Sequence, residues 1–119
     1  MRDHTKLTAF TLADELAVLV YQITRSFPRD ETYGLTSQMR RAAVSIPSNI
    51  VEGCARQSRA DYFRFPEIAF GSLRELHYQY RLAKRLGYVD DASPDLELKM
   101  EETERVLCAL TLSMRKDAC

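Results

Sequence analysis

Residues 40–53 read RRAAVSIPSNIVEG, a helical pattern with a proline at its centre. Pro47 has no backbone N–H for the carbonyl of Ala43, and an interior helical proline costs about 3 kcal/mol unless something compensates. Buried polar side chains beside such a point need hydrogen-bond partners, and they fix packing register at some cost in stability. We predict a structural kink that shapes the bundle, with ligand binding as the alternative. Its residues are Ser45, Pro47, Ser48, Asn49 and Gly53.

Apolar residues on both sides of this segment recur every three or four positions, which predicts amphipathic helices. The predicted helices cover residues 8–27, 36–54, 58–86 and 94–115. The first two inner seams are Ala9, Ala13, Leu16, Val20, Ile23 and Phe27, then Leu35, Met39, Ala42, Ile46, Asn49 and Gly53. The other two are Tyr62, Phe65, Ala69, Ser72, Leu76, Tyr80 and Ala83, then Leu96, Met100, Thr103, Leu107, Leu110 and Met114.

Residues that favour helix ends separate these stretches. Helix caps are predicted at Thr36, Ser58 and Ser93, and a glycine stop at Gly87. Four helices of about 20 residues joined by short turns predict an all-α, antiparallel up-down-up-down four-helix bundle. At 119 residues the whole chain, 1–119, is expected to form a single domain.

The overall composition excludes several classes of protein. The chain has 17 basic and 17 acidic residues, so it lacks the strongly basic balance of a dedicated nucleic-acid binder. Its apolar stretches are too short for a signal peptide or a membrane span. Three cysteines without paired or metal-type spacing favour free thiols in a reducing compartment. We therefore expect a cytoplasmic protein without membrane association.

The third helix carries a second apolar stripe, about 120° or more from the first at 100° per residue. It contains Phe63, Phe70 and His77, with Tyr78 nearby. Exposed apolar patches often mark partner surfaces, so we predict a subunit interface here. The alternative is that these aromatic rings pack at the edges of a wide bundle core.

Charge is unevenly distributed along the chain. Residues 25–89 hold eleven basic and six acidic side chains, whereas residues 90–104 hold seven acidic ones and a single lysine. Four cations on the third helix form a basic ridge, namely Arg74, Arg81, Lys84 and Arg85. The ridge could contact nucleic-acid phosphates. Pairing with the acidic start of the fourth helix is the alternative that we favour.

Motifs for catalysis or cofactor binding are not evident. A di-metal site in a bundle requires inward Glu-x-x-His pairs, but the histidines here are His4 near the terminus and His77, expected on the outer side of its helix. The cysteines have no evident histidine and acid beside them. We therefore predict no metal, no cofactor and no enzymatic activity.

Two long segments resemble a known family. They are FPRDETYGLTSQMRRAAVSIPSNIVEG (residues 27–53) and FRFPEIAFGSLRELHYQYRLAKRLGY (residues 63–88). They closely resemble the small four-helix-bundle family encoded in intervening sequences of bacterial large-subunit ribosomal RNA genes. That family also includes the accessory variability protein of diversity-generating retroelements, and the resemblance covers roughly residues 8–112.

The resemblance implies a ring-shaped homopentamer. For the retroelement relative, it implies binding of nucleic acid and of a reverse transcriptase through basic surface, although most members have no assigned activity. One departure is Pro66, where relatives usually carry leucine. A proline there should kink the third helix or delay its regular start to about Phe65.

Two functions follow from these observations. The first is a non-catalytic, self-assembling adaptor that presents its surface to a partner. The alternative is a nucleic-acid-binding accessory protein that contacts phosphates through the basic ridge, with a reverse transcriptase as a further expected partner.

Overall fold

The computed structural model describes residues 2–90 and 95–114, and those residues form helices and turns without a β-strand. Four α-helices follow one another: α1 (Thr8–Thr24), α2 (Leu35–Cys54), α3 (Arg59–Arg85) and α4 (Leu96–Met114). Two short 3₁₀-helices, η1 (His4–Lys6) and η2 (Arg29–Glu31), precede α1 and α2. None of the helices in the described part of the chain is long and apolar enough to cross a membrane.

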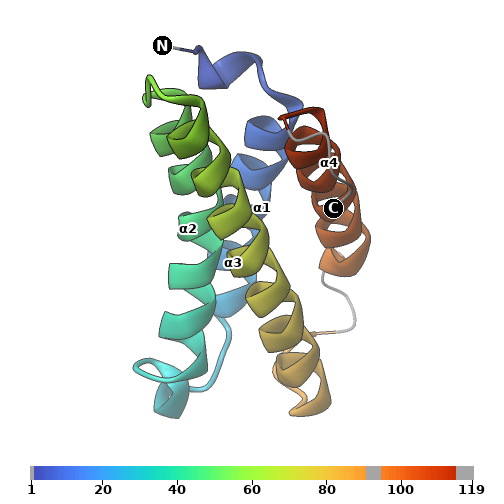
Figure 1. Cartoon of the computed structure of the whole chain (residues 1–119). Coiled ribbons are helices and arrows are strands. Elements are labelled where there is room, and N and C mark those ends of the chain that lie inside the picture. Colours follow the sequence, from blue (N-terminus) through green and yellow to red (C-terminus); the bar gives the residue numbers. More distant parts are fainter. Residues whose placement is uncertain (1, 91–94, 115–119) are drawn as a thin grey trace.

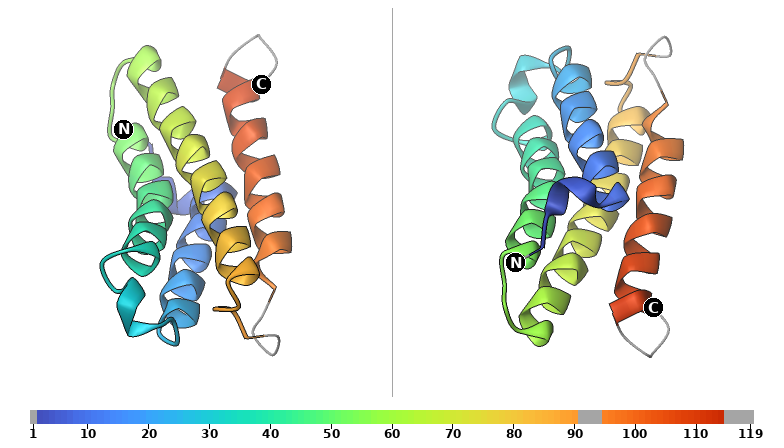
Figure 2. Two further views of the ribbon diagram at one scale, coloured as in Figure 1. Left: turned by 90° about the horizontal axis from the view of Figure 1, so that it is seen from below. Right: turned by 90° about the horizontal axis from the view of Figure 1, so that it is seen from above.

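The helices form an antiparallel four-helix bundle (Figures 1 and 2). α1 packs beside α2 and α4, and α3 packs beside the same two helices. Successive helices run in opposite directions, as the colour gradient in Figure 1 shows. The predicted fold class is therefore confirmed for a single chain. The assembly into a ring stays a prediction.

The core contains most of the predicted seam residues, with a shift on two helices. All six seam residues predicted for the first helix are buried, although α1 ends at Thr24 and Phe27 lies beyond it. On α2 the half-buried Asn49 is adjacent to Ile50, which is fully buried, and on α3 the half-buried Ser72 is adjacent to the fully buried Leu73. Each helix faces two neighbours, so its buried face is wider than one stripe. On α4, Leu110 is half-buried, and the Met114 side chain lies outside the described residues.

The ends of α3 follow from its sequence. The Ser58 side chain accepts a hydrogen bond from the Asp61 N–H at 3.1 Å, which confirms the predicted cap. Gly87 has φ +77°, and its N–H and that of Tyr88 bond the carbonyls of Lys84 and Ala83. This pattern is a Schellman motif, which glycine forms without steric cost, so the predicted stop is also confirmed.

The predicted cap at Thr36 is wrong. α2 begins at Leu35, Thr36 is buried, and the Glu31 carboxylate accepts the Leu35 N–H at 3.1 Å. An ionised carboxylate at a helix N-terminus also interacts favourably with the helix dipole, which explains why Glu31 fills this role. The predicted cap at Ser93 lies outside the described residues.

Both helical prolines lie within continuous helices. α2 runs through Pro47 and α3 through Pro66. α3 starts at Arg59, so the suggestion that Pro66 delays its regular start to about Phe65 is wrong. The Ser58 cap is sufficient to begin the helix, because a proline seven residues into it removes one hydrogen bond and not the first turn.

The cysteine prediction is correct for one residue and wrong for another. Cys54 is free and buried, whereas Cys108 is disulfide-bonded. The prediction relied on the absence of a paired spacing pattern, but a single disulfide does not require one. Cys119 lies outside the described residues. Burial raises the pKa of the Cys54 thiol, which disfavours the reactive thiolate.

Glu31 also joins the start of α2 to the end of α3, and this contact predicts a pH dependence of stability. Its carboxylate accepts the Tyr88 hydroxyl at 2.8 Å. The Leu35 N–H and then the Tyr88 hydroxyl lower the pKa of Glu31, and the bond to Glu31 raises the pKa of Tyr88. The contribution of Glu31 to the free energy of unfolding should be present above the ordinary carboxyl pKa. It should be lost as pH falls through the lowered pKa of Glu31 in the folded chain. The contribution of Tyr88 to the free energy of unfolding should be present below the ordinary phenol pKa. It should be lost as pH rises through the raised pKa of Tyr88 in the folded chain.

Urea unfolding measured across pH tests this prediction. Glu31→Gln should reduce the fall in the free energy of unfolding at acid pH, and Tyr88→Phe should reduce its fall at alkaline pH. Identical pH profiles for both variants and the wild type would contradict it.

Candidate functional site between α3 and α4

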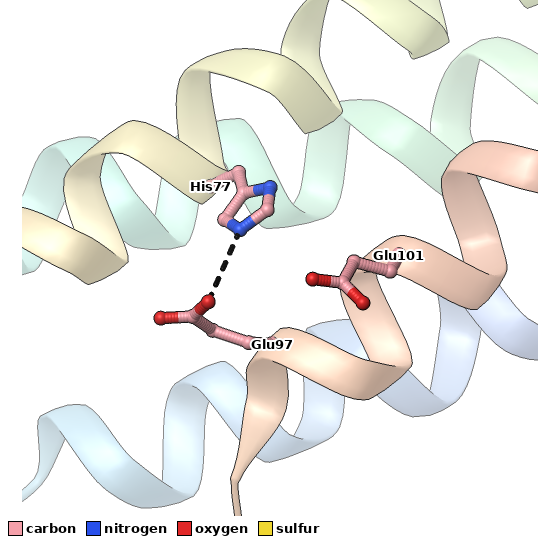
Figure 3. Close-up of side chains that lie close together, drawn as sticks. All are labelled: His77, Glu97 and Glu101. Atoms are coloured by element: carbon pink, nitrogen blue, oxygen red, sulfur yellow. Dashed lines mark ion pairs between the residues drawn. The ribbon is translucent and has the colours of Figure 1, made fainter.

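His77 lies between α3 and α4, where α4 covers it (Figure 3). Only 7% of the residue is exposed. Its Nδ1 is 3.1 Å from Oε1 of Glu104, and its Nε2 is 3.7 Å from Oε2 of Glu97. The expectation that His77 lies on the outer side of its helix is wrong, because α4 packs over that side of α3.

The hydrogen bond to Glu104 defines the tautomer of a neutral His77 ring. A carboxylate can only accept, so Nδ1 carries the hydrogen and Nε2 keeps its lone pair. Nε2 is buried and has no hydrogen-bond partner. The side chains of His77, Glu97 and Glu101 each offer a ligand atom, and these atoms lie within 4.8 Å of one another. Among the residues that the structure describes, these three therefore form the group that could hold a metal ion.

The basic ridge runs along α3 beside the same acidic residues. Arg74 lies 3.5 Å from the Glu104 carboxylate. Arg81 and Lys84 lie 3.7 Å and 3.3 Å from that of Glu97. The hydrogen bond to Glu97 raises the pKa of Lys84. Three ridge residues thus pair with α4, as the alternative to nucleic-acid binding predicted, and the fourth, Arg85, is exposed.

The predicted second apolar stripe is divided by the fold. Phe70 is half-buried against the main core, and Phe63 is half-buried against Cys54 and Tyr62. In the single chain these rings pack at the edges of the core, as the alternative reading expected. Tyr78 is the exposed member, at 64%. A subunit interface at these residues stays a prediction.

The polar residues around Pro47 form a small network between α2 and α3. The amide of Asn49 donates to the Ser45 carbonyl at 2.7 Å and to the Ser45 hydroxyl at 2.9 Å. The Ser45 hydroxyl lies 2.9 Å from that of Ser72. Asn49 therefore has partners within its own chain, whereas Ser48 is exposed. The kink itself stays a prediction.

The outward side of α2 carries a surface that the sequence did not predict, apart from the interface residue Tyr78. A hollow of about 540 Å³ lies between α2 and α3, and another of about 570 Å³ adjoins α1, the turn after η2 and α2. Arg41 and Ser45 line both hollows. The exposed apolar side chains at their walls are Tyr21, Tyr33, Val44 and Tyr78. We call Tyr21, Tyr33, Arg41, Val44 and Tyr78 the α2 outer surface.

A helical-period search would find part of this surface, because Val44 lies opposite the inner seam of α2. Tyr33 is different, since it lies in the turn before α2 and belongs to no periodic pattern. It is 95% exposed. Only the fold shows that Tyr33 adjoins the same hollow as Val44.

Comparisons with known proteins agree with the fold. A solved structure of a protein of unknown function from the S23 ribosomal protein family of Bacteroides thetaiotaomicron matches with a TM-score of 0.64. It is 22% identical, and the match covers 90% of this chain and 94% of the other. No curated protein matched in sequence. The model of the 23S rRNA-intervening sequence protein family matches residues 5–109, and this chain therefore belongs to that family.

Proposed function

We propose that this protein is a non-catalytic helical-bundle adaptor that assembles with further copies of itself through the α2 outer surface. The observation that carries the proposal is the group of exposed tyrosines and Val44 around two adjoining hollows. Exposed apolar groups of this kind mark partner surfaces, and tyrosine and arginine are enriched where binding energy concentrates. We propose a ring of five as the assembly, in keeping with the family resemblance.

Charge favours a second copy as the occupant of this surface. Arg41 on α2 and Glu75 on α3 both line the hollow between these helices. In a ring this surface contacts a different face of the next copy, and opposite charges on that face can pair with both of its charges, which favours a defined orientation. A partner of strongly acidic or basic character would instead leave one of the two charges repelled.

The partners of the acidic side chains support a non-catalytic role. Glu97 and Glu104 form ion pairs across α3 and α4. Glu52 pairs with Arg56, which lies just beyond the end of α2. Structural pairing of this kind accounts for these carboxylates without a reaction.

Sedimentation velocity over the micromolar concentration range tests the proposed assembly. The wild type should sediment as a multiple of the 13.7 kDa chain, with five copies as the proposed number. The double variant Tyr33→Ser, Val44→Ser should dissociate to single chains and keep its helical circular dichroism. Both residues are exposed, so their replacement removes contact area without opening the core.

Two further variants locate the interface. Leu98→Ser on α4 is the matched control, because Leu98 is 69% exposed and lies outside the α2 outer surface. Phe63→Ser probes the stripe that the sequence analysis predicted. A wild type that stays a single chain would overturn the proposal, and dissociation by Phe63→Ser alone would transfer the interface to that stripe.

Nucleic-acid binding through the basic ridge is the rival proposal, with a reverse transcriptase as a further partner. Pairing of Arg74, Arg81 and Lys84 with α4 makes it less favourable, because phosphates would have to compete with Glu97 and Glu104. Titration of labelled RNA and DNA at two ionic strengths separates the proposals. Binding that weakens steeply with salt and disappears when the four ridge residues are neutralised would support the rival.

A further inference from the structure

We propose that His77, Glu97 and Glu101 form a binding site for one zinc ion between α3 and α4. Glu97 and Glu101 are four residues apart on α4, so they project from the same side of that helix. Figure 3 shows both carboxylates and the imidazole of His77 gathered around one space. The ligand atoms of the three side chains lie within 4.8 Å of one another.

The buried state of His77 is the independent observation that points to a cation. Its Nε2 has no hydrogen-bond partner, although more than nine-tenths of the residue is buried. The nearest carboxylate oxygen, on Glu97, is 3.7 Å away, which is too far for a hydrogen bond. In the neutral ring with its hydrogen on Nδ1, the Nε2 lone pair faces negative charge. A metal ion between them would satisfy both groups.

Glu104 supplies the positioning that such a site needs. A metal-bound histidine usually donates its other ring N–H to a carboxylate or carbonyl, which fixes the ring and increases its basicity as a ligand. The Nδ1 of His77 has this relation to Oε1 of Glu104, at 3.1 Å. Glu104 therefore acts as a positioning residue and leaves Nε2 to the metal.

The ligand set selects the kind of ion. Imidazole suits zinc and its transition-metal neighbours, whereas magnesium and calcium prefer oxygen ligands alone. Ligands at zinc distances would lie roughly 3.4 Å apart in tetrahedral geometry. The ligand atoms lie within 4.8 Å of one another, so the half-buried Glu97 and Glu101 side chains would rotate closer to His77 when zinc binds. Three protein ligands leave a fourth position for water.

The neighbouring cations compete with the metal for one ligand. Lys84 contacts Oε1 of Glu97, whereas Arg81 and His77 lie near Oε2 of the same carboxylate. Zinc would displace Arg81, an exposed side chain whose ion pair contributes little. Bound zinc would then join α3 to α4 directly and stabilise the folded chain by ligand linkage.

Isothermal titration of metal-free protein with zinc chloride, together with thermal melting, tests the proposal. The wild type should bind one zinc ion per chain and melt at a higher temperature when saturated. Glu101→Gln and His77→Gln should each remove measurable binding and the rise in melting temperature. Glu104→Gln should weaken zinc affinity by about 10- to 100-fold, the usual effect of losing such a positioning partner.

Glu102→Gln is the matched control, because Glu102 is exposed on the same helix beside Glu101. It should bind zinc as the wild type does. Cobalt in place of zinc provides a signature of the ligands: nitrogen and oxygen ligands give no thiolate charge-transfer band. Equal affinity in the wild type and Glu101→Gln, or a thiolate band that points to Cys54, would overturn the proposal. Circular dichroism checks that each variant is folded.

Discussion

Leu73→Ala is expected to lower the free energy of unfolding by roughly 2–5 kcal/mol, the range for leucine truncation in a packed core. Leu73 is completely buried in the core cluster that α1, α2, α3 and α4 share. Its truncation removes apolar contacts and leaves a cavity that four helices can only partly fill. Urea unfolding followed by circular dichroism should show a lower midpoint with an unchanged slope.

Ile68→Ala provides the control on the same helix. Ile68 is 43% exposed and lies five residues before Leu73. Its truncation leaves no enclosed cavity, so we expect a loss of less than about 1 kcal/mol. Equal losses for the two variants would show that Leu73 is not in the core.

Gly53→Leu should destabilise the fold by about 3 kcal/mol or more, because α2 and α3 approach each other at this residue. A Cβ on Gly53 would lie 3.0 Å from the Phe65 Cβ and 3.4 Å from both the Pro66 Cδ and the Tyr62 carbonyl oxygen. These atoms belong to the backbone or lie next to it, so they cannot rotate away. Gly53→Ala should cost less, since alanine regains about 0.8–1.0 kcal/mol of helix propensity.

Gly71→Ala is the matched control for both glycine variants. Gly71 lies inside α3, is exposed, and has no atom within 4 Å of an added Cβ. Alanine should therefore stabilise the protein by roughly 0.4–1 kcal/mol through the unfolded chain and helix propensity. The melting temperature should then be higher than that of the wild type for Gly71→Ala and lower for Gly53→Leu. A stable Gly53→Leu variant would contradict the close approach of α2 and α3.

The sequence predicted the helices well and their buried faces less well. The stripe of α1 is correct because its apolar residues follow one line, but Ile50 and Leu73 were missed beside polar seam residues. A period of 3.6 residues gives the direction of a single face, whereas a helix in a four-helix bundle packs against two neighbours. The width of the buried face depends on that packing, so the periodicity of the sequence does not predict it.

Local sequence by itself determined where the helices lie, how α3 begins and ends, and to which family the chain belongs. The helices and their ends depend on residues within a few positions of one another, and the family match depends on the order of residues along the chain. The tertiary structure alone decided the surroundings of His77 and which carboxylates of α4 pair with each residue of the basic ridge. Glu97 and Glu104 are 20 and 27 positions from His77, and only the packing of α4 against α3 brings them to it. The burial of a side chain and its ion pairs depend on how two helices pack together, so the sequence does not show that these side chains meet.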